Sequence, residues 1–173
     1  MTSLSSSDVI AIASGIVAIC ALATSFWQAR LSRKHNEISV RPHLLIHYYI
    51  ESQIPLTIEI KNVGLGPAII KSVNACFGHV CFAIHSAPTM LRMIKLLIPE
   101  NPDFTYKCEL FSQYSVIAPG ESIKWLILTS KTDQEGVFKA INSNLNSFKI
   151  HIQYQCMYGN NFSLGESTES CNT

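Results

Sequence analysis

The sequence has little charge. Only 14% of its residues are charged, against about 25% in a typical soluble domain, and 13 basic against 12 acidic side chains give a formal net charge of +1. A general binder of DNA or RNA carries clustered positive charge, so no general nucleic-acid binding is expected. The 173 residues have room for one ordinary domain and an added segment, but hardly for two independent catalytic domains.

Charge and proline are both absent from residues 9–27, which read VIAIASGIVAICALATSFW. As a helix these residues extend roughly 28 Å, close to the thickness of the hydrocarbon core of a bilayer. A cleaved signal peptide is the alternative, because Ala21, Leu22 and Ala23 form an A-x-A pattern. Residues 1–8, however, contain Asp8 and no Lys or Arg. The sequence therefore predicts a short N-terminal segment at 1–8 and a transmembrane helix at 9–27.

Positive charge is concentrated directly after the predicted span. Residues 28–41 hold four basic side chains and one acidic one, and we expect them to form a basic juxtamembrane helix that Pro42 ends. By the positive-inside rule, this predicts a single-pass membrane protein with its N-terminus outside and its C-terminal domain in the cytoplasm. The predicted membrane-interface residues are Trp27, Arg30, Arg33 and Lys34.

Small side chains recur at spacings of three and four along the predicted span, so they share one face of the helix. Such a face lets transmembrane helices pack closely, and the protein would then be a homo-oligomer. The alternative is that small residues only dilute a generic anchor. The predicted helix-packing residues are Ala11, Ser14, Gly15, Ala18, Ala21 and Ser25.

The cysteines have no framework-like spacing. Outside the span their number is odd, which predicts reduced thiols in a cytosolic compartment. The densest metal-like cluster is Cys76-x2-His79-x-Cys81-x3-His85. On a single strand, Cys76 and Cys81 would face opposite sides, so no metal site is expected.

From residue 42 onward the hydrophobic period changes to two. Leu56, Ile58 and Ile60 alternate with polar residues, which is typical of a half-buried strand. Seven or eight such segments predict a mainly β fold, an antiparallel sandwich at 42–165, followed by a flexible tail at 166–173. The predicted strands are 43–51, 56–61, 69–76, 80–84, 104–111, 123–129, 149–157 and 161–164.

Two segments interrupt this pattern, and we expect short helices at 86–97 and 135–145. The first has a capping Ser86 before Pro88 and is apolar on most sides. Such a helix closes one end of a sandwich, offers a surface patch to a partner, or contacts the membrane. The candidate partner patch is Met90, Leu91, Met93, Ile94 and Leu97.

Four motifs resemble those of a broad group of small, uncharacterised bacterial membrane-anchored proteins. They are SRKHNEISVRPHL at 32–44, NVGLGPAII at 62–70, PGES at 119–122 and YQCMYGNNF at 154–162. The resemblance implies a protein of the bacterial inner membrane with one N-terminal helix and an immunoglobulin-like cytoplasmic β-sandwich at 42–165, and it carries over no catalytic residue. Gly64 and Gly66 suit a tight connection in which Asn62 bonds its own backbone. Tyr154 is spaced from Cys156 like the tyrosine corner of immunoglobulin-type domains.

No motif indicates a reaction. Gly64-x-Gly66 fails as a dinucleotide fingerprint because Pro67 has no amide N–H, and no nucleophile motif surrounds a cysteine. We therefore expect no cofactor, no catalytic residue and a non-enzymatic membrane-anchored sensor or effector. Its expected partners are the lipid bilayer, further copies of itself, and an unknown protein or small-molecule ligand. The layout is analogous to that of bacterial defence proteins. The alternative is a passive adaptor or accessory subunit of a larger inner-membrane complex.

Overall fold

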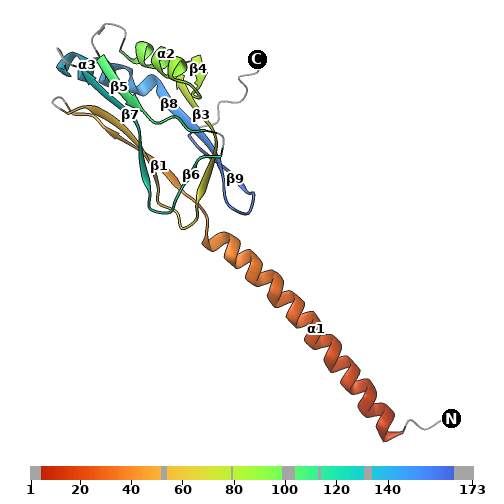
Figure 1. Ribbon diagram of the computed structural model, residues 1–173. Coiled ribbons are helices and arrows are strands. Elements are labelled where there is room, and N and C mark those ends of the chain that lie inside the picture. Colours follow the sequence, from red (N-terminus) through yellow and green to blue (C-terminus); the bar gives the residue numbers. More distant parts are fainter. Residues whose placement is uncertain are drawn as a thin grey trace. The chain divides into compact units, whose positions relative to one another are not determined.

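The computed structural model describes residues 5–51, 54–78, 80–98, 104–112, 114–130 and 134–165 (Figure 1). The chain divides into two compact units between Ser39 and Val40. The first unit contains the helix α1, and the second contains the strands and the remaining helices. We call the described residues from Val40 to Gly165 the β domain. The predicted tail at 166–173 lies outside the described residues.

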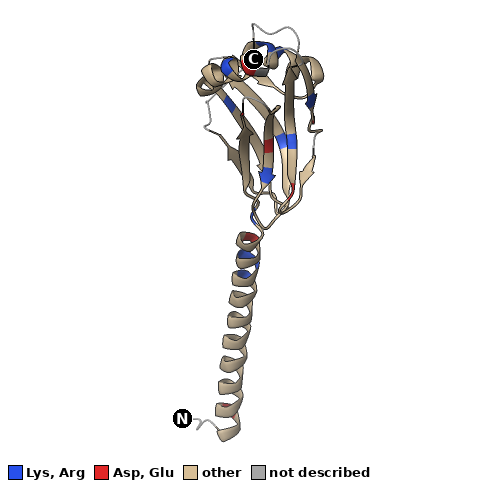
Figure 2. Cartoon of the chain, turned by 90° about the vertical axis from the view of Figure 1, so that its left-hand side faces the viewer, with Lys and Arg blue, Asp and Glu red and all other residues tan. Residues whose placement is uncertain are grey.

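Helix α1 (Ser6–Ser39) merges the predicted span and juxtamembrane helix into one element of 34 residues. None of its residues is buried, and it is long and apolar enough to cross a membrane. It ends three residues before Pro42, because the residue before a proline avoids helical geometry. Figure 2 shows basic residues, in blue, near its C-terminal end and a long stretch without basic residues before them. Length and composition thus agree with the predicted membrane-spanning helix.

The β domain contains two antiparallel sheets. The first has the strand order β1-β2-β7-β5, and the second has the order β4-β3-β8-β9, with β6 paired to β3. The strands of the first sheet are β1 (Leu44–Tyr49), β2 (Leu56–Asn62), β5 (Phe104–Cys108) and β7 (Ser122–Ser130). Those of the second are β3 (Ala68–Phe77), β4 (Val80–Ala83), β6 (Val116–Ile117), β8 (Phe148–Gln155) and β9 (Asn161–Leu164). The predicted antiparallel β architecture after an N-terminal helix is confirmed.

A single hydrophobic core joins the two sheets. Alternate residues of β2, namely Leu56, Ile58 and Ile60, are at most 3% exposed. They share one cluster with Ile150 and Ile152 of β8 in the other sheet. Period-two patterning therefore directs the apolar face of each sheet toward a common interior, as the sequence predicts.

Helix α2 (Ala87–Leu97) lies at the same end of the β domain as α3 (Gln134–Asn144), which a short 3-10 turn, η1 (Leu145–Ser147), follows (Figure 1). Four residues of the candidate partner patch, Met90, Met93, Ile94 and Leu97, are at most 1% exposed and belong to the core, and Leu91 is half-buried. Their spacing of three and four puts them on one face of the helix. The helix thus closes one end of the sheets, and these side chains do not form the surface patch.

Candidate functional site

Asn62, the last residue of β2, is the centre of the candidate site. Residues of β2 alternate between interior and surface, and this alternation turns the Asn62 side chain inward, where it is 0% exposed. A buried amide needs hydrogen-bond partners, because each unpaired polar group costs about 1–3 kcal/mol. The surroundings of Asn62 must therefore supply both donors and acceptors.

All four hydrogen-bonding positions of the Asn62 amide are occupied. Its Oδ1 accepts hydrogen bonds from the backbone N–H groups of His43 (3.2 Å) and Gly64 (3.0 Å). Its Nδ2 donates to the backbone carbonyls of Gly66 (2.8 Å) and Ile117 (3.0 Å). An amide has two donor hydrogens and two acceptor lone pairs, so this side chain is fully satisfied. It joins three segments that are distant in the sequence.

Backbone hydrogen bonds reinforce the same junction. The Val63 N–H donates to the His43 carbonyl at 2.8 Å, and the Leu65 N–H donates to the Arg41 carbonyl at 3.2 Å. We call residues 40–43 and 62–66, together with Ile117, the clamp. The clamp holds the first residues that follow α1 in the chain.

Gly64 and Gly66 provide the space that the clamp requires. A Cβ atom on Gly66 would meet the backbone carbonyl of Val40, and one on Gly64 would meet the backbone nitrogen of His43. Neither glycine has a positive φ. Close approach of two backbone segments, rather than an unusual conformation, therefore requires glycine at both positions.

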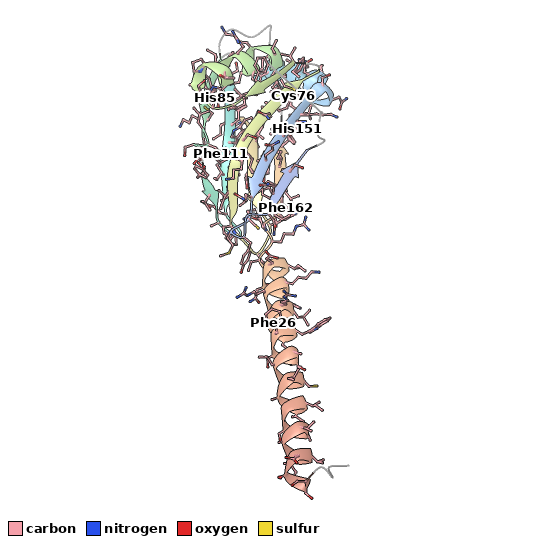
Figure 3. All side chains as sticks on the ribbon, turned by 90° about the vertical axis from the view of Figure 1, so that its right-hand side faces the viewer. Phe26, Cys76, His85, Phe111, His151 and Phe162 are labelled. Carbon is pink, nitrogen blue, oxygen red and sulfur yellow. A yellow bond between two sulfur atoms is a disulfide. The ribbon has the colours of Figure 1, made fainter. Side chains whose placement is uncertain are left out.

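Arg41 links the clamp to the second sheet. Its guanidinium carbon lies 4.5 Å from the centre of the Phe162 ring on β9, and that ring stacks on Tyr154 of β8 with the ring centres 5.6 Å apart. Phe162 is labelled in Figure 3. A surface cavity of about 370 Å³ borders this stack. It is lined by Lys71, Gln153, Tyr154, Asn161, Phe162 and Ser163.

A second surface cavity lies beside β1, β2 and β7. It has a volume of about 230 Å³ and is lined by Tyr49, Glu51, Ile54, Thr57, Glu59 and Lys124. No residue of the clamp lines it. Arg41 contacts Phe162, and Phe162 lines the first of these two cavities but not the second.

The predicted helix-packing and membrane-interface residues all lie on α1, and all are exposed. Trp27 is 74% exposed, and the Arg30 guanidinium carbon is 4.5 Å from the centre of the Phe26 ring, which Figure 3 shows projecting from α1. The hydroxyls of Ser14 and Ser25 donate to carbonyls one turn earlier in the same helix. Because these hydroxyls are satisfied internally, packing along this face would depend on close van der Waals contact.

Cys76 and Cys81 form a disulfide. The chain reverses between them at Gly78, whose φ is +58°, so that Cys76 on β3 lies directly opposite Cys81 on β4. In this structure the two cysteines are therefore a bonded pair and not the free thiols that the sequence predicts. The sequence predicts separate strands at 69–76 and 80–84, but reasoning that considers the two cysteines only on a single strand misses the pairing that brings them together.

No metal-ligand cluster is found in the described part of the chain. No three His, Cys, Asp or Glu side chains group there as a metal site would need, and His79 lies outside the described residues. Cys20, Cys108 and Cys156 are free thiols, and burial raises the pKa of Cys108. Burial also raises the pKa of Tyr48.

The raised pKa of Cys108 predicts slow alkylation. The thiolate is the reactive form, and a raised pKa lowers its fraction at pH values below the pKa. We expect iodoacetamide to modify Cys108 several-fold more slowly at about pH 8 than an exposed cysteine placed on the same strand by Lys107→Cys. Mass spectrometry of the alkylated peptides over a pH series measures both rates. Equal rates would contradict the raised pKa.

These features define a class of protein in which one long apolar helix is followed by an antiparallel β domain of two sheets. The model of the family described as Domain of unknown function (DUF8453) matches residues 9–169, so the chain belongs to this family. The matched residues include most of α1 as well as the β domain. No curated protein matches the chain.

The sequence reasoning found part of the clamp. The bond between Asn62 and its own turn, at Gly64, is present as expected. The bonds to His43 and Ile117 were missed, although one signal could have indicated them. Asn62 continues the inward series Leu56, Ile58 and Ile60, and a polar residue at an inward position requires buried partners.

Proposed function

We propose that this protein is a non-enzymatic, membrane-anchored sensor or effector of the bacterial inner membrane, with its N-terminus outside and its β domain in the cytoplasm. The exposed apolar surface of α1 supports the anchor, and the basic residues near its C-terminal end support this orientation. The match to the family model also supports a membrane-anchored protein, because the matched residues include both α1 and the β domain. A role in bacterial defence belongs to the proposal by analogy of layout alone.

The β domain is, in this proposal, an immunoglobulin-like sandwich. The order β1-β2-β7-β5 corresponds to strands A-B-E-D of that fold, and β3-β8-β9 corresponds to C-F-G, which supports the assignment. Two hallmarks differ. Tyr154 lies near the end of β8 and stacks on Phe162, so the expected tyrosine corner near the start of this strand is not formed. The buried Trp125 lies on β7. In the immunoglobulin fold the buried tryptophan lies instead on the strand that corresponds to β3.

The contact between Arg41 and Phe162 is the observation that carries the sensor function. Phe162 borders the cavity of about 370 Å³, a volume within the range of small-molecule sites. Arg41 lies two residues after the end of α1. A ligand that displaces the Phe162 ring would change the interactions of Arg41 and so of the chain that continues into α1. The clamp confines this change to a short stretch because it fixes residues 41 and 43 by hydrogen bonds.

Self-association of α1 supplies the output in this proposal. The small residues on one face would let copies of the helix pack closely, and a change in that packing would reach the membrane. We expect the full chain in lipid nanodiscs to form a discrete oligomer. The double substitution Gly15→Leu and Ala18→Leu should weaken this oligomer at least roughly tenfold, because leucine holds the helix backbones apart. Native mass spectrometry at several protein-to-lipid ratios measures the effect.

A matched control is available on the opposite face of the same helix. Ala13→Leu with Cys20→Leu adds bulk there, since both positions lie roughly 140–160° around the helix from Gly15 and Ala18. The control should retain the oligomer. If both double variants behave alike, or if the unmodified chain is monomeric, the sensor with an oligomeric output is contradicted. Recovery of a monomer bound to another membrane protein would instead favour the passive adaptor.

A further inference from the structure

We propose that Cys76 and Cys81 are a reversible thiol–disulfide modification site whose oxidation state controls how firmly β4, and with it the start of α2, is held to the second sheet. This inference goes beyond the proposed function and does not depend on the side of the membrane on which the β domain lies.

The position of the pair in the hairpin carries the inference. Cys76 and Cys81 are directly paired across β3 and β4, with their Cα atoms 4.0 Å apart and only five positions apart in the sequence. A cross-link of this kind closes a very short loop, so the compactness of the whole domain does not depend on it. Among the described residues neither cysteine belongs to the hydrophobic cluster that joins the two sheets, although Cys76 is buried. The disulfide therefore acts locally, on the hairpin.

The strand that the disulfide fastens is short and lies at an edge. β4 has four residues, and among the described strands it pairs with β3 alone. Its pairing with β3 continues for one more residue, where the Ile84 N–H donates to the Val73 carbonyl at 2.8 Å. Three residues later α2 begins and inserts Met90 and Ile94 into the core. Breaking the disulfide would leave a short edge strand between a tight turn and a well-anchored helix.

The surroundings of Cys76 are suited to thiol chemistry. Lys149 on β8 is its direct partner on the other side of β3, so a positive side chain and the sulfur belong to neighbouring positions on one face of the sheet. A nearby cation favours the thiolate, which is the nucleophile in thiol–disulfide exchange. Cys81 is half-buried, whereas Cys76 is 4% exposed, which makes Cys81 the sulfur that a soluble reagent reaches first. Cys76 would then be the resolving thiol.

The chemistry requires an oxidant, and a hydroperoxide supplies it. The Cys81 thiolate attacks the peroxide O–O bond, gives a sulfenic acid and releases water or an alcohol. The Cys76 thiolate then displaces the sulfenic hydroxyl, which leaves as water, and the S–S bond forms. Both sulfurs together lose two electrons, and the peroxide gains them. A dithiol reverses the step by exchange and becomes a cyclic disulfide itself.

The test uses the full chain in detergent, first reduced with dithiothreitol and then exposed to hydrogen peroxide. Peptide mass spectrometry should find the linked Cys76–Cys81 peptides after peroxide and both free thiols after renewed reduction. Hydrogen exchange of the amides of β4 and Ile84 should be at least roughly tenfold faster in the reduced chain, while the central strands β3 and β8 keep their protection.

Two variants make the result specific. Cys76→Ser with Cys81→Ser should exchange at β4 as the reduced chain does, whatever oxidant is present. Cys108→Ser with Cys156→Ser, which leaves the pair intact, should keep the full redox response. The proposal is overturned if peroxide oxidises the cysteines without linking Cys76 to Cys81, if dithiothreitol cannot open the bond in the folded chain, or if β4 exchanges equally in both forms. Since the unmodified chain is compared with itself in its two redox forms, poor folding of a variant does not prevent a decision.

Discussion

Replacing Asn62 with leucine is expected to lower the free energy of unfolding of the β domain by about 3–5 kcal/mol. Leucine branches at Cγ as asparagine does, although its methyl groups take more room, and it makes none of the four hydrogen bonds. The N–H groups of His43 and Gly64 and the carbonyls of Gly66 and Ile117 would then lack their side-chain partner in a buried place. This combination of several lost bonds at one residue explains why the expected effect is large.

Urea unfolding of the full chain in detergent, followed by circular dichroism of the β domain, measures this change. Asn142→Leu is the matched control, because Asn142 is exposed on α3. Its effect should stay within about 0.5 kcal/mol. A loss below about 1 kcal/mol for Asn62→Leu would contradict the conclusion that its amide holds the clamp together.

Gly66→Ala should lower the free energy of unfolding by about 2–4 kcal/mol. The added Cβ would overlap the Val40 carbonyl, so the segment at 40–43 would have to move away from the loop at 62–66. The movement would break the hydrogen bond from the Leu65 N–H to the Arg41 carbonyl. Hydrogen exchange at Leu65 should therefore increase by more than the overall loss of stability explains.

Gly120→Ala is the matched control, because it distinguishes a clash with neighbouring atoms from an unfavourable backbone conformation as the cause of the lost stability. Gly120 has a φ of +77° and nothing within 4 Å of an added Cβ, so alanine there costs about 1–2 kcal/mol of backbone strain. In Gly120→Ala, hydrogen exchange at Leu65 should increase only as much as the overall loss of stability explains. Equal exchange behaviour in the two variants would show that close approach at Gly66 is not what shapes the clamp.

The elements of the fold could be predicted because they depend on local patterns. An uncharged run identified α1, and alternation identified all strands except β6, whose two residues are too few to form a pattern. Pro88 in the first turn and apolar spacing identified α2. What α2 covers could not be derived in the same way, since burial of Met90 and Ile94 depends on the distant strands they meet.

The candidate site was less accessible to sequence reasoning because its contacts join distant residues. The bond from Asn62 to Ile117 spans 55 positions, and Arg41 meets Phe162 only because β9 lies beside β8 in the second sheet. The disulfide shows the same difficulty at short range. Whether Cys76 and Cys81 face one another depends on where the chain reverses, and Gly78 alone does not specify this.

The pairing of Cys76 with Cys81 bears directly on the compartment. A permanent disulfide is typical of oxidising compartments, whereas a reversible one is compatible with the cytoplasm. The proposed orientation and the proposed redox site therefore make a joint expectation. In untreated cells the pair should be mostly reduced, and brief exposure to peroxide before trapping with an alkylating reagent should convert it to the disulfide.

Protease protection in bacterial spheroplasts tests the central claim, that α1 spans the inner membrane and keeps the β domain on its cytoplasmic side. Protease added outside intact spheroplasts that express the full chain should leave the β domain whole. The same protease should degrade it, or cut the chain at exposed loops, once the membrane is permeabilised. Loss of the β domain in intact spheroplasts, or release of the chain into the soluble fraction, would contradict the account.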